Sequence, residues 1–387
     1  MAIENYYCSQ KFDWVEIRLY DGLVASCCQA QPDHINISDV ETHPVGFFNY
    51  PKIKQDRQMM LDNQRIAGCE EGCWKVEDRG INSRRINFNS QVKKYTDLDQ
   101  VPKTINLVLS NTCLQSCVYC SKTYSSSWMN DVAVNGDYDM PGYLDRYNLN
   151  TRDKILLQLG QPDLYKTKLS KLLIDQIESI SDKVDKLIIT GGEPLLDNQL
   201  IDIVSKLSRI KDITIFTGLG VSSSRLKRIC SDLANFKNIT FTISAENTGK
   251  FHEFTRYGTS YSDWTDNFNI VSSKFPINFV SVISNLTMFD FANFLTANKQ
   301  HTVSFNYNND SSFLAPNMLD PESKNKIINE LNKLQHHEIS NVVKYINQDC
   351  PDNSRELLNK FLSRYIAPRK LTLEIFPSSF LNWIGLT

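Results

Sequence analysis

Short β-rich runs alternate with amphipathic helical stretches from about residue 101 onward, and this alternation limits the fold more than any other feature. The β-rich runs lie at 104–109, 186–190, 213–217, 239–244, 277–283 and 303–307. Helical stretches are predicted near 121–131, 167–181, 197–209, 222–235, 261–274 and 288–298. Strands that alternate with helices are typical of a parallel α/β sheet or barrel. The chain is therefore predicted to be an α/β protein.

The region before this alternation is rich in cysteines and turns. An Asp21-Gly22 turn signal lies between alternating runs at 14–19 and 23–26. This pattern predicts a β-hairpin. Eight of the ten cysteines fall in the first third of the chain, so the N-terminal region is expected to be a small cysteine-rich module.

The chain is expected to contain three parts. Their predicted bounds are 1–100 for the cysteine-rich module, 101–310 for the α/β core and 311–387 for a helical C-terminal extension. The first two core strands are separated by an extra polar segment near 130–165. Such a long insertion is usually functional or disordered, and our hypothesis is that it helps to shape a substrate cavity.

Composition excludes several classes of protein. The chain has 387 residues, of which 41% are hydrophobic, and its net charge is -2. Global disorder and a bulk basic surface for nucleic acid are therefore not expected. No apolar run of about 18 residues and no secretory signal is seen, so a cytoplasmic location without membrane contact is expected. In that reducing compartment, cysteines are poor candidates for disulfides.

Three cysteines follow the first core strand in a tight loop. Cys113, Cys117 and Cys120 have the spacing C-x3-C-x2-C. Soft thiolates suit iron–sulfur clusters or zinc. Structural zinc sites need four protein ligands, and no fourth Cys or His lies close by. Three ligands on a four-iron cluster leave one iron open to a substrate or cofactor.

This loop, with the aromatic Tyr119 before its last cysteine, resembles the radical S-adenosylmethionine (radical SAM) superfamily. The second core strand is followed by Gly-Gly-Glu-Pro at 191–194, which looks like the GGEP motif of that family. GGEP alone would be weak evidence for this family, because Gly-Gly after a strand is an ordinary turn. The two motifs together cover 113–194, and the strand–helix alternation extends the resemblance to about 307.

The resemblance implies a partial (β/α)6 barrel with a [4Fe-4S] cluster at its C-terminal mouth. Cys113, Cys117 and Cys120 would be the cluster ligands and the catalytic residues. SAM would bind the open iron, and its reductive cleavage would give methionine and a 5′-deoxyadenosyl radical that abstracts hydrogen from substrate. The residues that the resemblance places near SAM are Tyr119, Gly191, Gly192, Glu193, Pro194, Ser244, Glu246, Arg256 and Ser284.

These implied contacts with SAM differ from residue to residue. The backbone at 191–193 would receive the amino group, because glycine permits a close approach. Ser244 and Glu246 would contact the ribose or the carboxylate. An Arg256 fork would hold the carboxylate, and Ser284 would approach the adenine or ribose. Many relatives carry Asp-Gly where this chain has Glu246-Asn247.

The N-terminal cysteines resemble the SPASM/twitch auxiliary-cluster module. The spacing C-x13-G-x4-C joins Cys8, Gly22 and Cys27, and Cys69 and Cys73 would complete four thiolates for a second [4Fe-4S] cluster. The hairpin would place Cys8 and Cys27 at adjacent strand ends. Cys28 is an alternative to Cys27, which the glycine spacing favours.

A second pattern supports this resemblance. In twitch-containing relatives with an N-terminal module, a CW-x-x-E-x-x-G-x-x-S-R stretch follows the last module cysteine. Here the stretch from Cys73 to Arg84 fits that pattern. The usual module follows the barrel, whereas here it precedes it. A four-cysteine zinc site stays open as an alternative, since its ligands and spacing are the same.

The leading prediction is a radical SAM enzyme with an unidentified substrate, either a small molecule or a peptide. A flavodoxin or ferredoxin is the expected electron donor, and no membrane or nucleic-acid partner is expected. The alternative is a non-catalytic iron–sulfur electron-transfer or binding protein, which would have no need for GGEP. A zinc-binding nucleic-acid module conflicts with the acidic charge balance.

Overall fold

The computed structural model describes residues 6–27, 30, 32–43, 45–78, 83–90, 94–138, 140, 162–308, 311–350 and 353–386. Cys28, Gly80 and most of the extra polar segment lie outside the described residues. The chain forms two compact units. Unit 1 consists of Met1–Ser110, Tyr147–Ile215 and Phe236–Ile239, and unit 2 of Asn111–Arg146, Phe216–Asn235 and Thr240–Thr387. Among the described residues, no helix is long and apolar enough to cross a membrane.

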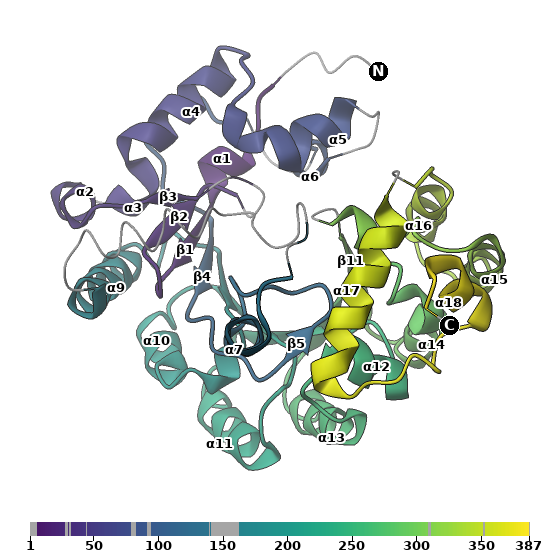
Figure 1. Ribbon diagram of the computed structural model, residues 1–387. Coiled ribbons are helices and arrows are strands. Elements are labelled where there is room, and N and C mark those ends of the chain that lie inside the picture. The colour runs from purple at the N-terminus through teal and green to yellow at the C-terminus, as the bar shows by residue number, and fades with distance from the viewer. Residues whose placement is uncertain are drawn as a thin grey trace. The chain divides into compact units, whose positions relative to one another are not determined.

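Unit 1 is built on a mixed sheet (Figure 1). Its strands, in spatial order, are β3 (Asp33–His34), β2 (Leu23–Ala25), β1 (Trp14–Arg18), β4 (Thr104–Val108), β6 (Lys186–Thr190) and the first part of β7 (Asp212–Thr217). The pairs β1–β4, β4–β6 and β6–β7 are parallel, whereas β1–β2 and β2–β3 are antiparallel. The predicted hairpin is confirmed by the pairing of Ile17 with Val24.

The parallel pairing of β1 with β4 was not anticipated from the sequence. It sets Ile17 opposite Leu107, and both side chains are fully buried. The pairing is reinforced by the Leu19 amide, which donates a 2.9 Å hydrogen bond to the Val108 carbonyl. The N-terminal hairpin thus extends the parallel sheet.

Unit 1 also contains helices of 4 to 18 residues. The helices are α1 (Gln10–Asp13), α2 (Ile37–Thr42), α3 (Gly46–Asn49), α4 (Pro51–Leu61), α5 (Lys75–Asp78), α6 (Arg84–Asn89), α9 (Pro162–Ser179) and α10 (Leu200–Lys206). A 3₁₀ turn at Ala67–Cys69 and a π turn at Glu70–Trp74 precede α5. The expectation that Cys8 lies at a strand end is wrong, because α1 separates Cys8 from β1.

Unit 2 contains three parallel strands and a two-residue ribbon. The strands β8 (Ile239–Ser244), β10 (Ile277–Ile283) and β11 (Thr302–Tyr307) follow in spatial order. The ribbon pairs β5 (Ser116–Cys117) with β9 (Arg256–Tyr257) in antiparallel fashion. The unit's helices are α7 (Ser126–Asn135), α11 (Ser223–Leu233), α12 (Gly249–Thr255), α13 (Tyr261–Ser272), α14 (Met288–Ala297), α15 (Pro321–Leu331), α16 (Ile339–Ile346), α17 (Ser354–Arg369) and α18 (Ser378–Ile384).

Helix α11 illustrates how the sequence pattern fixes the core of unit 2. Ser222 caps its N-terminus by accepting a hydrogen bond from the Arg225 amide. Its buried side chains recur at helical spacing and include Leu226 and Cys230. Cys230 therefore packs in the core of unit 2.

The helix predicted near 121–131 has a different start. Helix α7 begins only at Ser126, because Ser125 accepts a hydrogen bond from the Trp128 amide and so caps the helix. Residues 121–124 form turns instead. The chain leaving the third cysteine is thus irregular for several residues before the helix starts.

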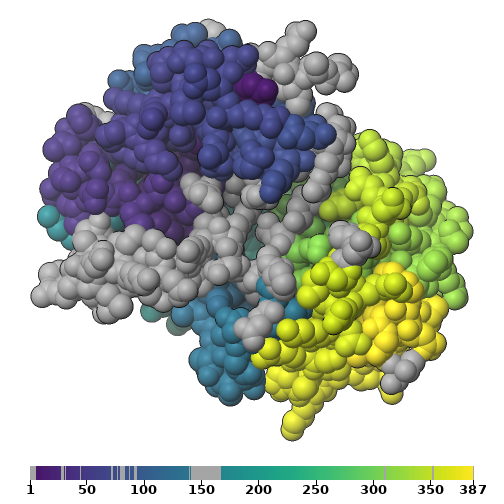
Figure 2. Space-filling view, turned by 45° about the horizontal axis from the view of Figure 1, so that its top comes forward, coloured from purple at the N-terminus to yellow at the C-terminus, as the bar shows by residue number. Residues whose placement is uncertain are grey.

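The C-terminal part of unit 2 is helical, as predicted. Helix α15 packs against both α16 and α18. In the space-filling view, residues after 311 form a contiguous green-to-yellow surface (Figure 2). Near the C-terminus, Phe376 packs edge to face against Phe254, with 5.0 Å between the ring centroids.

Candidate active site

The loop that carries the three cysteines of unit 2 is held by the serines at the start of α7. The Ser126 and Ser127 hydroxyls donate to the Cys113 carbonyl at 3.1 and 2.9 Å, and the Cys113 amide donates to the Ser126 hydroxyl at 3.0 Å. The Cys120 amide closes a turn by donating to the Cys117 carbonyl at 2.9 Å. The backbone of the loop is therefore fixed at both ends.

The middle of the loop is held by the β5–β9 ribbon. This pairing sets Cys117 opposite Arg256. The Trp128 indole donates to the Cys117 carbonyl at 2.9 Å, and the Tyr365 hydroxyl donates to the Ser116 carbonyl at 2.8 Å. Side chains from α7 and α17 thus donate hydrogen bonds to the carbonyls of Cys117 and Ser116 and hold the backbone that carries the Cys117 side chain.

The three thiols share one environment. Cys113 and Cys117 are buried and Cys120 is partly buried. Burial raises the pKa of Cys117 and of Cys120 to about 12, and the Arg256 charge opposes this at Cys117. Electrostatic interactions join Cys120 to both Cys113 and Cys117.

The donor set of this loop suits an iron–sulfur cluster. Across the part of the chain that the structure describes, no three Cys, His, Asp or Glu side chains are close enough to hold a single metal ion. In a cluster each thiolate binds a different iron, so the sulfurs stand further apart than ligands of one ion. Two buried thiols and one partly buried thiol on one loop, which has an exposed side at Leu114 (57% exposed), fit a cluster with one accessible iron.

Glu246 is fully buried at the end of β8, and its carboxylate is fully engaged. Arg256 donates to it from Nε and from Nη2, each at 2.9 Å. The Tyr119 hydroxyl donates at 2.8 Å, and the Val282 amide donates at 3.1 Å. The structure therefore brings together three residues that the sequence analysis assigned to SAM, and it joins them to one another.

The same network reaches the cysteine loop. Arg256 Nη1 lies 3.9 Å from the Cys117 sulfur, and the guanidinium carbon lies 5.6 Å from the centre of the Tyr119 ring. Sequence reasoning missed this link between Arg256 and Cys117, because it depends on a pairing between strands 139 residues apart.

The remaining strand-end residues of unit 2 differ in how they are engaged. Ser244 is half-buried at the end of β8. Ser284 is buried in a turn, where its amide donates to the Thr287 hydroxyl at 2.9 Å. The Asn285 side-chain amide is also engaged, since it donates to the Phe313 carbonyl at 3.0 Å.

The motif at 191–194 lies in unit 1, directly after β6. A side chain at Gly191 would place its Cβ 2.7 Å from the Ser110 carbonyl oxygen, so only glycine fits there. The Gly192 amide donates to the same oxygen at 2.7 Å. Glu193 is buried, and its carboxylate caps the turn Pro194–Leu196 by accepting from the Leu195 amide at 3.1 Å. The motif is therefore a tightly determined turn.

The N-terminal cysteines also gather in unit 1. Cys8, Cys69 and Cys73 share one buried cluster with Trp74. The Cys27 thiol is buried and donates to the Gln10 side chain at 3.5 Å.

Lys11 connects Cys27 with this group. Burial lowers the pKa of Lys11, but the charges of Cys69, Asp56 and Cys27 raise it, and the net shift is upward. Its ammonium pairs with Asp56 at 2.6 Å. A buried lysine that interacts with two of the cysteines is suited to a site that carries negative charge.

In the described part of the stretch from Cys73 to Arg84, Glu77 is buried and interacts electrostatically with Cys73. Glu77 forms a buried ion pair with Arg85 at 2.6 Å, and the Ser83 hydroxyl donates to Glu77. The Arg85 guanidinium lies 4.9 Å from the Trp74 ring centre. Sequence reasoning named Arg84 but missed Arg85. The available clue was that a second arginine directly follows the motif, eight residues after Glu77.

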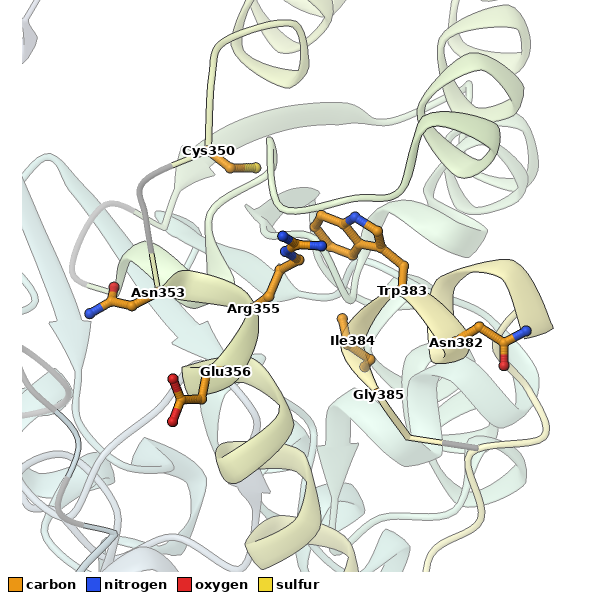
Figure 3. Close-up of a pocket in the computed structure, with 8 residues that line it drawn as sticks. All are labelled: Cys350, Asn353, Arg355, Glu356, Asn382, Trp383, Ile384 and Gly385. Atoms are coloured by element: carbon orange, nitrogen blue, oxygen red, sulfur yellow. The ribbon is translucent and has the colours of Figure 1, made fainter.

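A separate pocket of about 500 Å³ lies at the start of α17. It is lined by Cys350, Arg355 and Trp383 among others, and Figure 3 shows the Arg355 guanidinium against the Trp383 indole, 5.2 Å from the ring centre. No residue that the sequence analysis assigned to a site lines this pocket.

Comparisons with known proteins find similarity in the part of the chain that contains the cysteine loop. Residues 107–296 match the family described as the Radical SAM superfamily. The chain is 37% identical over 78 residues to a GTP 3′,8-cyclase of Alkaliphilus oremlandii (strain OhILAs), which covers 19% of this chain and 24% of that protein. It is 32% identical over 87 residues to a GTP 3′,8-cyclase of Mesorhizobium japonicum, which covers 20% and 25%. The chain thus spans about a quarter of the length of the curated relatives it matches.

Two solved structures show weaker likeness. One is native anSMEcpe with bound AdoMet and Kp18Cys peptide, at 14% identity, 62% coverage of each chain and a TM-score of 0.37. The other is Streptococcus suis SuiB bound to the precursor peptide SuiA, at 12% identity, 95% coverage of this chain, 71% of that chain and a TM-score of 0.34. The family match is to residues 107–296, which hold both the three-cysteine loop and the motif at 191–194, so this part of the chain is similar to the radical SAM superfamily.

Proposed function

We propose that this protein is an enzyme that cleaves SAM reductively and uses the resulting 5′-deoxyadenosyl radical to abstract hydrogen from a substrate. The observation that carries the proposal is the buried loop with Cys113, Cys117 and Cys120 inside the matched family region. When bound there, a [4Fe-4S] cluster supplies the electron for this cleavage. The GTP 3′,8-cyclase relatives also support an enzyme.

The residues of the chain would supply binding and orientation. The three cysteines would hold three irons of the cluster and would leave the fourth open to SAM. The glycines at 191–192 let the backbone approach the SAM amino group closely, which the tight turn against Ser110 supports. We propose that Tyr119, Ser244 and Ser284 contact the rest of the SAM molecule.

At the level of the fold, we propose a partial (β/α)6 barrel for 101–310. The parallel pairs β4–β6, β6–β7, β8–β10 and β10–β11, each followed by a helix or turn, support it. Residues 1–100 would form the auxiliary module of the twitch/SPASM type, and 311–387 the helical extension.

We propose that the N-terminal cysteines hold a second [4Fe-4S] cluster. Its ligands would be Cys8, Cys27, Cys69 and Cys73. The shared burial of three of them, and the interaction of Lys11 with Cys69 and Cys27, support this ligand set. Structural zinc is the competing occupant, and metal analysis separates the two.

The substrate and the electron donor are proposed only by class. A flavodoxin or a ferredoxin would supply the electron. The substrate would be a small molecule, in keeping with the GTP 3′,8-cyclases among similar proteins, or a peptide.

The test is anaerobic incubation of the reconstituted protein with SAM and dithionite, followed by chromatographic measurement of 5′-deoxyadenosine. We expect product from the wild type and none from Cys117→Ala. Cys350→Ala is the matched control, because Cys350 is half-buried and lies outside both cysteine groups. A cluster-loaded wild type that makes no 5′-deoxyadenosine would instead favour a non-catalytic iron–sulfur protein.

A further inference from the structure

We propose that Arg256 is a positioning residue for the cluster ligand Cys117, and that it makes the cluster easier to reduce by donating a hydrogen bond to that cysteine's sulfur. In this role Arg256 does not hold the SAM carboxylate. The inference rests on the proposed function, since it assumes a cluster on Cys113, Cys117 and Cys120.

The hydrogen-bond donors of Arg256 are committed within the protein. Nε and Nη2 both donate to Glu246 at 2.9 Å, and Nη1 points to the Cys117 sulfur at 3.9 Å. Arg256 is 4% exposed and Glu246 is not exposed at all. The fork that would clamp a SAM carboxylate is thus already occupied by a carboxylate of the protein.

Glu246 is held in turn from two other directions. The Tyr119 hydroxyl and the Val282 amide donate to its two oxygens. A carboxylate with four donors has a single position, and it therefore fixes the plane of the guanidinium. Once that plane is fixed, the two N–H bonds of Nη1 have fixed directions within it, and the Cys117 sulfur lies 3.9 Å from Nη1.

The backbone around Arg256 leaves room for this arrangement. A Cβ at Gly218 would lie 3.2 Å from Arg256 Nη1 and 2.4 Å from the Gln115 side-chain oxygen. Because Gly218 has no side chain, the Arg256 guanidinium and the Gln115 side chain can both pack against its backbone. The β5–β9 pairing adds a second constraint, because Cys117 and Arg256 are cross-strand partners.

The expected effect on the cluster follows from its charge. Reduction adds negative charge to the cluster and its thiolates, so a buried N–H donor stabilises the reduced form more than the oxidised form. Loss of this donor should make reduction harder. A lysine at 256 keeps the positive charge but lacks the planar fork, so it cannot serve Glu246 and Cys117 together.

The test compares wild type with Arg256→Lys and Arg256→Gln after anaerobic reconstitution. The electron paramagnetic resonance signal that changes on SAM addition identifies the cluster, and it is followed in a potentiometric titration. We expect the ratio of reduced to oxidised cluster at a fixed potential to fall about tenfold in both variants. The dissociation constant for SAM, measured by equilibrium dialysis, should change less than about threefold, since no SAM contact is lost. Arg355→Lys, at an arginine of unit 2 that packs on Trp383 in the separate pocket, should leave the ratio unchanged.

An unchanged ratio together with SAM binding weakened by tenfold or more would overturn the inference and assign Arg256 to SAM. If the variants do not fold or load iron, wild-type protein labelled with ¹⁵N-arginine decides. Without SAM, its reduced cluster should show hyperfine coupling to a guanidinium nitrogen, and absence of coupling would overturn the inference. A wild type with no SAM-sensitive signal would mean that the proposed function itself fails.

Discussion

The Tyr365 hydroxyl lies 2.8 Å from the carbonyl oxygen of Ser116, although 249 residues separate the two in sequence. That carbonyl belongs to the residue immediately before Cys117. The same hydroxyl lies 3.1 Å from the Phe254 carbonyl. Helix α17, from the C-terminal extension, therefore supports the backbone of the cysteine loop from within unit 2.

Tyr365→Phe should weaken this support. The change removes the single hydroxyl proton that lies within reach of both carbonyls, and a buried carbonyl left without its donor typically costs about 1–2 kcal/mol in the free energy of unfolding. We also expect less iron to be retained on the loop after gel filtration. Urea unfolding and iron analysis measure the two effects.

Tyr307→Phe is the matched control for this prediction. Within the described residues, the buried Tyr307 hydroxyl has no hydrogen-bond partner, so its removal should cost nothing. Equal stability and equal iron content in the two variants would show that the Tyr365 hydroxyl does not support the loop.

Much of the fold could be predicted because its signals are local. The strands β6, β8 and β10 have the predicted bounds, since each is an apolar run between turn residues. The parallel pairing of β1 with β4 could not be predicted. It joins segments about ninety residues apart, as in the pair Glu16 and Asn106, and no local pattern specifies such a partner.

The candidate site divides in the same way. The cysteines at 113, 117 and 120 were visible as a spacing. The contacts that hold them come from residues far along the chain, such as Arg256 and Tyr365. In the sequence, the buried pair of Arg256 and Glu246 looks the same as an exposed ion pair would. The burial of these two side chains therefore could not be predicted.

Glu77→Gln should strongly destabilise unit 1. It leaves the buried Arg85 without its charged partner, and breaking such a pair costs about 3–5 kcal/mol. Asp78→Asn is the matched neighbour: its pair with Arg65 is exposed, so no resolvable change is expected. Thermal and urea unfolding of both variants check this, and equal stability of the two would contradict a buried role for Glu77.

The triple variant with Cys113, Cys117 and Cys120 changed to Ala should retain only the auxiliary site. Reconstituted wild type should hold about eight iron atoms if both sites are [4Fe-4S], and the variant about four. Iron, sulfide and zinc analysis measure this. Tightly bound zinc in place of the remaining iron would identify the N-terminal site as structural zinc.

His252 should make stability depend on pH. Burial, together with the charge of Arg256, lowers the pKa of His252 from 6.5 to about 3. Between these values the unfolded chain binds a proton that the folded chain does not, so the free energy of unfolding falls as the pH falls below 6.5. The slope approaches about 1.4 kcal/mol per pH unit.

His252→Phe should remove this part of the pH dependence, because phenylalanine fills a similar space between Tyr261 and Trp264 without titrating. Urea unfolding at pH 7.5, 6.5 and 5.5 compares the two proteins. Identical pH dependence would show that folding does not lower the pKa of His252.

Gly258→Ala should displace the cysteine loop itself. Gly258 follows β9 with φ of +115°, and an added Cβ would lie 2.3 Å from the Leu114 carbonyl oxygen. That oxygen belongs to the backbone between the first two cysteines, so it can yield only if the loop moves. We expect loss of most loop-bound iron and of 5′-deoxyadenosine formation.

Gly249→Ala is the control, because Gly249 also has a positive φ, of +50°, but a Cβ there meets nothing within 4 Å. Its cost is then backbone strain alone, about 1–2 kcal/mol, with iron retained. If both variants keep their iron equally, the close approach of Gly258 to Leu114 does not determine the position of the loop.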